Sequence, residues 1–192
     1  MNRRILWHAI GVGLICAILL AGALGEPKRQ ILFYVSGFGF LALLSLIFII
    51  SIPLLARAWK SPHAEMLLAN RRQMGIYSFV FALIHVILVF NFFFAWDAGK
   101  ILANPNSLFL IMGAAAFLML ALMAASSNDF SMKALGRNWK YLQYLIYSAI
   151  LLILVHFIAV GKIFAQNTVI VAILLLVALA VLALRFILKQ PK

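Results

Sequence analysis

Six long apolar stretches, separated by short polar segments, dominate the pattern of the chain. They run over Ile5–Leu24, Ile31–Ala56, Met74–Ala95, Ser107–Ala125, Tyr141–Gly161 and Thr168–Leu188. Each is about as long as the roughly 20 residues that a helix needs to cross the hydrocarbon layer of a bilayer. A backbone exposed to lipid must satisfy its own hydrogen bonds, so these stretches are expected to be helices. The pattern predicts an all-α integral membrane bundle of six transmembrane helices, forming a single domain over residues 1–192.

Composition agrees with a membrane location. Of the 192 residues, 67% are hydrophobic and only 10% are charged, whereas soluble domains are about half apolar and about a quarter charged. The net charge of +12 would favour nucleic acid as the partner of a soluble protein. Here the basic residues lie between apolar stretches, where the lipid bilayer explains them better. We therefore expect no nucleic-acid partner.

Lysine and arginine are distributed unequally between the two sides of the expected bundle. Twelve lie on the side that would carry both termini, and four lie on the opposite side. Because such residues accumulate in cytoplasmic loops, both termini are expected in the cytoplasm. Trp7, Trp59, Trp96 and Trp139 all fall at expected span ends, where amphipathic rings favour the interface.

The first span has features of a secretory signal peptide. Arg3 and Arg4 precede it, and small residues follow at 21–23. Its apolar part is about 20 residues, longer than the roughly 7–15 of a signal peptide, and five more spans follow. We therefore expect an uncleaved helix. The lone Cys16 excludes an intrachain disulfide.

Two of the four histidines, His85 and His156, lie deep inside apolar stretches. Each would lie about 15–20 Å from the cytoplasmic end of its helix, at about 1.5 Å per residue, so similar depths are expected. Ionisable residues inside membrane spans are rare and usually functional. Two neutral imidazoles at matching depth can ligate one haem iron from opposite faces. The alternatives are a hydrogen bond to a neighbouring helix, and proton or substrate handling.

Small residues accompany the histidines on their helical faces. Ser78 and Ala82 precede His85 by spacings that share a face. Their size would leave room for a flat macrocycle, although small residues also let helices pack closely. His8 is expected at the interface and His63 in a solvated loop, and neither is a first choice for iron.

The cytoplasmic ends of the same two spans lack a second histidine pair. Gln143 precedes His156 by about 20 Å along the helix, and Arg71 and Arg72 occupy the corresponding end of the other span. The sequence therefore predicts one haem. The arginines either contact a haem propionate, a lipid phosphate or a cofactor phosphate, or belong to an ordinary positive-inside loop.

Three stretches resemble a known family: RRQMGIYSFVFALIHVILVF at 71–90, KALGRNWKYLQYLIYSAILLILVH at 133–156 and IPLLAR at 52–57. They are similar to ferric-reductase-like transmembrane proteins, and most similar to haem-binding membrane subunits of bacterial periplasmic methionine sulfoxide reductase systems. The resemblance covers about residues 33–164. It implies that His85 and His156 are the haem ligands, whereas Gln143 stands where the family has a histidine.

The resemblance implies electron transfer across the bacterial inner membrane through haem b, with flavin mononucleotide as a further associated cofactor. Reducing equivalents would enter from a cytoplasmic flavin reductase or from quinone. They would leave to a periplasmic molybdenum-containing reductase that repairs oxidised methionine. Because Gln143 replaces the family histidine, a generic ferric- or metal-reductase-like protein is the alternative. No G-x-G-x-x-G fingerprint is present, so we expect a redox subunit rather than a complete enzyme.

Two alternatives come from other classes of protein. One is a small transporter that uses the histidines as a relay without haem. Such carriers often have helices broken by Gly or Pro near the midplane, whereas Pro53 lies near a cytoplasmic end. The other is a membrane-embedded assembly factor without a cofactor. An absorption spectrum separates both from a haem protein.

Overall fold

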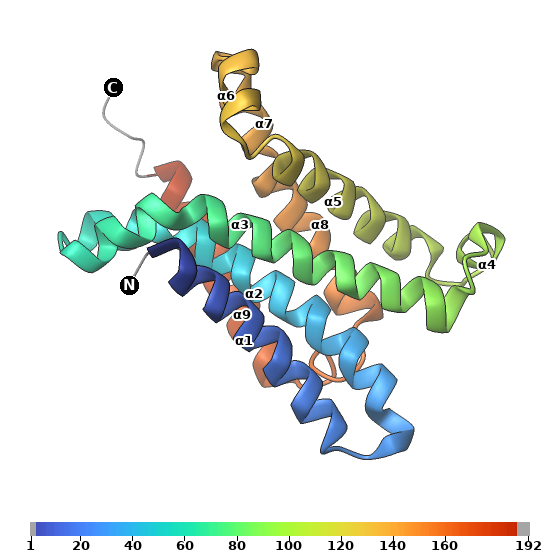
Figure 1. The fold of residues 1–192 in the computed structure, drawn as a ribbon. Coiled ribbons are helices and arrows are strands. Elements are labelled where there is room, and N and C mark those ends of the chain that lie inside the picture. Colours follow the sequence, from blue (N-terminus) through green and yellow to red (C-terminus); the bar gives the residue numbers. More distant parts are fainter. Residues whose placement is uncertain (1–2, 188–192) are drawn as a thin grey trace.

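The computed structural model describes residues 3–187, and every regular element among them is helical (Figure 1). The predicted all-α fold is confirmed. The end that the sequence predicts for the sixth span, Leu188, lies outside the described residues, as do Lys189 and Lys192.

Six helical stretches of the described chain are long and apolar enough to span a membrane, as the sequence predicts. The long helices are α1 (Arg3–Ala23), α2 (Gln30–Ala58), α3 (Pro62–Val89), α5 (Ser107–Ala125), α8 (Leu145–Val160) and α9 (Thr168–Ile187). The shorter elements are η1 (Pro27–Arg29), η2 (Phe90–Phe94), α4 (Ala98–Leu102), α6 (Asp129–Leu135) and α7 (Arg137–Gln143).

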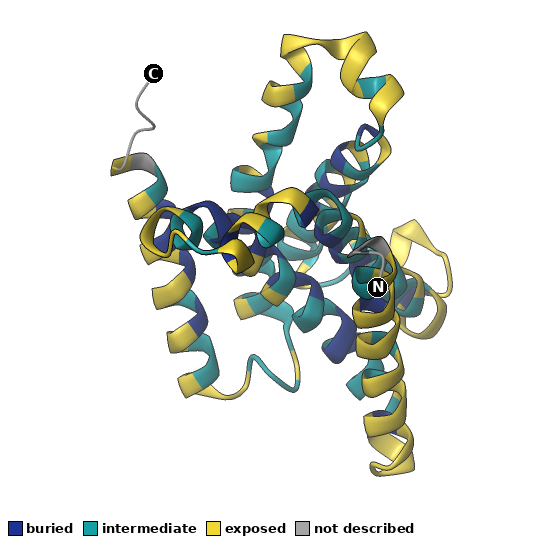
Figure 2. Cartoon of the chain, turned by 60° about the vertical axis from the view of Figure 1, so that its left-hand side comes forward, coloured by how far each residue is buried: buried dark blue, intermediate teal, exposed yellow. Residues whose placement is uncertain are grey.

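Helix α2 forms the centre of the bundle. Half of its most apolar stretch is buried, against 11–17% in the other five spans. Its Phe38, Leu43 and Ile50 pack with Phe81 of α3 and Ile150 of α8 in the main core. Helix α1 is largely exposed, shown in yellow below the N label in Figure 2. In a bilayer, lipid covers such apolar surface, so burial within the protein is not required of every span.

Helix α3 begins about three turns earlier than the apolar pattern predicts. It starts at Pro62 rather than Met74. The hydroxyl of Ser61 accepts a hydrogen bond from the Ala64 amide at 3.3 Å, and proline is well suited to the first helical turn. His63 is therefore exposed in the first turn of a helix, so its expected exposure is confirmed and its expected loop is wrong.

The fifth span is interrupted near its predicted start. Helix α7 ends at Gln143 and α8 begins at Leu145, with Tyr144 between them. Gly136, whose φ is +51°, separates α6 from α7, and a positive φ of this kind suits a residue without a Cβ. In Figure 1, α6 and α7 project from one end of the bundle above α5 and α8.

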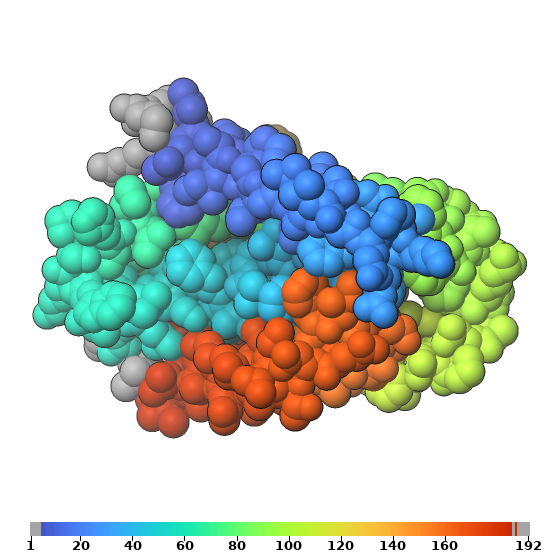
Figure 3. Space-filling view, turned by 90° about the horizontal axis from the view of Figure 1, so that it is seen from below, coloured from blue at the N-terminus to red at the C-terminus, as the bar shows by residue number. Residues whose placement is uncertain are grey.

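The connections alternate between two ends of the bundle. The start of α1 and the end of α9 lie at the same end as the α2–α3 connection (Figure 1). The α1–α2 and α8–α9 connections meet at the other end, as blue and orange surfaces in Figure 3. This alternation agrees with an even number of spans. That the end carrying both termini faces the cytoplasm stays a prediction.

Candidate functional site

The structure brings His85 of α3 and His156 of α8 together inside the bundle. Their ring centroids lie 6.4 Å apart, and their ring planes are inclined by 85°. The site lies beside the central core, where Phe81 and Leu154 are almost fully buried. The two residues are distant in sequence, so only the packing of α3 and α8 around α2 makes them neighbours.

Each imidazole is held through the same nitrogen atom. Nδ1 of His85 lies 2.8 Å from the carbonyl oxygen of Val35 on α2. Nδ1 of His156 lies 2.9 Å from the carbonyl oxygen of Phe109 on α5. Because a carbonyl oxygen only accepts, Nδ1 carries the proton in each ring. The neutral ring then keeps its lone pair on Nε2, the nitrogen available to a metal.

This donor set fits the axial ligation of a haem. A bare structural zinc ion takes about four protein ligands, and the described residues include no group of three or more His, Cys, Asp and Glu that could hold a metal ion. A haem needs only two axial ligands from the protein. Two metal–nitrogen bonds of about 2 Å, with about 1.1 Å from each nitrogen to its ring centre, give about 6.2 Å between ring centres. The observed 6.4 Å agrees with this value.

The small residues predicted beside His85 are close to α2. Ser78 is fully buried, and its hydroxyl donates to the carbonyl oxygen of Ala42 at 3.3 Å. Ala82 is 8% exposed and belongs to the same core. Ser78 therefore supports the contact between α3 and α2, and Ala82 contributes to the core between the helices. A contact between these residues and a macrocycle stays a prediction.

Gln143 is bound at the carboxyl end of α5, and Arg72 is bound just beyond it, at the α5–α6 connection and the start of α6. The guanidinium of Arg72 donates to the carbonyl oxygen of Ser127 and to the carboxylate of Asp129, each at 2.6 Å. The Gln143 amide donates to the Ser126 hydroxyl at 3.3 Å and to the Met123 carbonyl at 3.4 Å. We call these contacts the inner clamp. They join α3 to the α5–α6 connection and to α6, and they join α7 to the end of α5, at the level where a second pair of haem ligands would lie.

Arg71 lies apart from its neighbour Arg72. Its charge lies within electrostatic range of Arg185 on α9 and Tyr147 on α8. Arg185 donates to the Tyr147 hydroxyl at 3.2 Å, whereas Nε of Arg71 is enclosed without a hydrogen-bond partner among the described residues. Two guanidinium groups thus lie near each other, an arrangement that favours an anion between them. Sequence reasoning missed Arg185 and Tyr147 because only tertiary packing brings them to Arg71.

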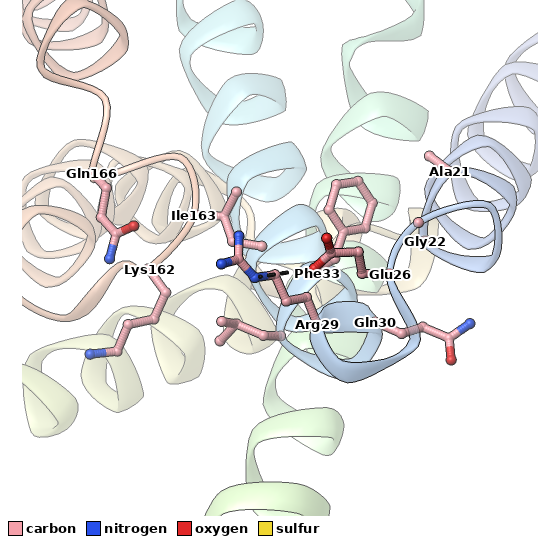
Figure 4. A pocket seen from close by; sticks show the side chains of 11 residues that line it. Ala21, Gly22, Glu26, Arg29, Gln30, Phe33, Lys162, Ile163 and Gln166 are labelled. Carbon is pink, nitrogen blue, oxygen red and sulfur yellow. Dashed lines mark ion pairs between the residues drawn. The ribbon is translucent and has the colours of Figure 1, made fainter.

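A cavity of about 570 Å³ opens at the other end of the bundle, between the α1–α2 and α8–α9 connections (Figure 4). Its lining includes Glu26, Arg29, Phe33, Lys162 and Gln166. Arg29 and Glu26 form an ion pair of 3.6 Å, but both side chains are nearly four-fifths exposed, so the pair contributes little. The cavity is open and is lined by both charged and apolar side chains, unlike the histidine site.

A chain of aromatic contacts joins this cavity to the helix that carries His156. The ring of Phe33, in the cavity wall, lies 6.2 Å from that of Phe164. Phe164 stacks on Phe40 at 4.4 Å, and Phe40 lies 6.1 Å from Phe157. Phe157 follows His156 directly in the chain. Aromatic side chains therefore lead from this cavity to α8, at the residue that follows His156.

Two main-chain partners of the site were not predicted from the sequence. The carbonyl groups of Val35 and Phe109 hold the two imidazoles. Every residue carries a backbone carbonyl, so the identity of Val35 or Phe109 contains no signal for this role. Only the position of each helix relative to the histidine reveals it.

Residues 36–154 match a protein family described as the ferric reductase like transmembrane component. The chain is also similar to the heme-binding subunit of protein-methionine-sulfoxide reductase from Pasteurella multocida, with 31% identity over 134 residues. The alignment covers 69% of this chain and 62% of that relative, so the chain spans less than two thirds of the relative's length.

Proposed function

The chain belongs to the ferric-reductase-like transmembrane family, and we propose that it is a haem b subunit that relays electrons across the membrane. It is a multi-pass protein of the bacterial inner membrane. The proposed direction is from the cytoplasm to the periplasm, with both termini in the cytoplasm. The whole of residues 1–192 would act as one domain, with a ferric-reductase-like core at about 33–164.

The pair of imidazoles carries this proposal. His85 and His156 lie at a ring separation suited to one metal between them, and each has its Nδ1 engaged by a backbone carbonyl. The bound haem would supply a one-electron couple, whose potential depends on axial ligands and burial. The protein's own residues orient the two imidazoles. The surrounding apolar side chains keep water away from the site.

One haem is proposed rather than two. At the level of a second site, Arg72 and Gln143 are engaged by the inner clamp. Neither an arginine nor a glutamine is an ordinary axial ligand of haem iron. The family's second ligand position is thus used here to bind α5, which supports an electron path with a single haem.

The donor and acceptor are proposed by class. A cytoplasmic flavin reductase or quinone would supply electrons at the inner end, with flavin mononucleotide as a candidate cofactor there. Arg71 is a candidate contact for an anionic group at that end. It lies about 21 Å from His85 along α3, a distance that favours a lipid or flavin phosphate over a haem propionate.

The proposed acceptor is a periplasmic molybdenum-containing reductase that acts on methionine sulfoxide. The Pasteurella relative is named as the heme-binding subunit of protein-methionine-sulfoxide reductase, which supports a methionine sulfoxide reductase as the acceptor. The aromatic contacts from Phe157 to Phe33 support an electron exit near the outer cavity. A generic ferric or metal reductase remains the second candidate, because Gln143 departs from the family pattern.

Absorption spectra of the purified full chain test the proposal. We expect a Soret band and sharp reduced α and β bands from the wild-type protein, with one haem per chain. His85→Ala and His156→Ala should each abolish this low-spin spectrum, whereas His63→Ala, at an exposed position in α3, should preserve it. A colourless wild-type protein made with ample haem would refute haem binding and favour a histidine relay.

A further inference from the structure

Each histidine ring of the site lies against a glycine of a neighbouring helix. A Cβ atom built on Gly39 of α2 would lie 2.9 Å from Nδ1 and 3.1 Å from Cε1 of His85. A Cβ on Gly113 of α5 would lie 2.6 Å from Nδ1 and 2.8 Å from Cε1 of His156. Real Cβ atoms are essentially never found closer than 3.0 Å to another residue's heavy atom. An alanine at either position would therefore move the imidazole.

Both glycines stand one helical turn after the carbonyl that holds the ring. Val35 precedes Gly39 by four residues, and Phe109 precedes Gly113 by the same spacing. In an α-helix, positions four apart lie on one face. We call each pair of carbonyl and glycine a ring seat. The α2 seat holds His85 and the α5 seat holds His156.

Local helix structure does not explain these glycines. Both lie in the interior of a helix, and neither has a positive φ. Glycine is less favourable than alanine in a helix interior. A close tertiary approach is therefore the physical reason for glycine at these positions. Gly11 and Gly22 receive tyrosine rings in a similar way, whereas Gly39 and Gly113 receive the two imidazoles of the candidate site.

We propose that Gly39 and Gly113 are positioning residues for the two axial ligands, an inference that rests on the haem function proposed above. Each glycine lets the ring come close enough for Nδ1–H to donate to the seat's carbonyl. That bond fixes the tautomer and leaves Nε2 for the iron. The contact also limits rotation of each ring, so the two seats hold the imidazole planes near the observed 85°.

Gly39→Ala and Gly113→Ala in the full-length chain test this role, with Gly75→Ala as the matched control. Gly75 lies on α3, the helix of His85, and its Cβ would meet nothing within 4 Å. Loss of an outer partner of a metal ligand typically weakens binding by roughly 10- to 100-fold. We expect weaker haem binding of that order and a growing high-spin fraction in both seat variants. Gly75→Ala should match the wild type.

Nitrogen NMR of the histidines in haem-free protein gives a second measurement. The wild-type protein should show the Nδ1–H tautomer for both His85 and His156. Gly39→Ala should change the tautomer balance of His85 and leave His156 as an internal reference, and Gly113→Ala should do the reverse. A wild-type Nε2–H tautomer at either ring would overturn the inference even if the alanine variants did not fold.

These measurements separate the inference from the proposed function. A wild-type protein that binds haem, together with seat variants of unchanged haem affinity and spin state, would refute the seats alone. A wild-type protein that binds no haem would refute the proposed function. In that case the NMR measurement still decides whether the seats orient the rings.

Discussion

Replacing Gln143 by histidine tests the proposed number of haems. The substitution places a histidine where the resemblance to the family implies one. In this chain, however, the corresponding end of α3 offers Arg72, whose guanidinium is bound to Ser127 and Asp129 at 2.6 Å. A single new imidazole would have no second histidine opposite it. We therefore expect Gln143→His to leave the haem content at one per chain.

The effect on stability follows from the bonds that Gln143 makes. Its amide donates at 3.3 Å to Ser126 and at 3.4 Å to Met123, both at the long end of hydrogen-bond distances. The net contribution of one hydrogen bond to stability is about 0.5–1.5 kcal/mol. Because both bonds of Gln143 are long, we assign about 0.5 kcal/mol to each of them. Histidine keeps one donor, which makes a loss of about 0.5–1 kcal/mol the expected result. The melting temperature should then fall by about 1–4 °C.

The assay combines haem quantification per chain with thermal unfolding in detergent. Gln166→His is the control, because it makes the same chemical change in the connection that lines the cavity at the other end of the bundle, away from the inner clamp. Two haems per chain after the single substitution would refute the reasoning. A fall in melting temperature far beyond a few degrees would show that the inner clamp contributes more than its two long hydrogen bonds.

Three further predictions concern charge, topology and ring geometry. Arg72→Gln should lower the free energy of unfolding by about 1–2 kcal/mol, because it removes a main-chain bond and an ion pair. Arg71→Gln should leave the free energy of unfolding unchanged or raise it, because it relieves repulsion from Arg185. If chemical denaturation showed equal losses of stability for the two variants, this expected difference between Arg71 and Arg72 would be wrong. In a Cys16→Ala background, a membrane-impermeant maleimide should label Lys162→Cys but not Lys140→Cys in intact cells, and the reverse labelling would invert the proposed orientation. Electron paramagnetic resonance of the ferric protein should give the strongly anisotropic low-spin signal of near-perpendicular axial imidazoles, whereas a signal typical of parallel planes would disagree with the structure.

Much of the fold could be predicted from the sequence because lipid imposes simple requirements. An apolar stretch of sufficient length must be a helix in the bilayer, and the described residues contain six such stretches. Local signals also existed where the prediction failed. Ser61 and Pro62 form a helix start, but the apolar pattern begins only at Met74, so the pattern alone predicts a loop at His63.

The candidate site was predictable only in part. His85 and His156 could be selected because an ionisable group is rare inside a span, and their similar depth follows from helical rise. Ser78 and Ala82 could be selected by spacing, but the sequence left open whether they face a macrocycle or a helix. The structure bonds Ser78 to α2 and places Ala82 in the main core of the bundle.

The sequence by itself determined the solvent of this protein, the number of its spans and the two histidines, because hydrophobicity and helical rise are local properties. Only the tertiary structure decided which surfaces these residues meet. It directed Arg72 to the α5–α6 connection and Arg71 toward α9, although the two are adjacent in the chain. It also joined the imidazoles to Gly39 and Gly113 through the packing of α3 on α2 and α8 on α5. The physical reason is that helix rotation and close approach depend on contacts between distant segments, which no local pattern encodes.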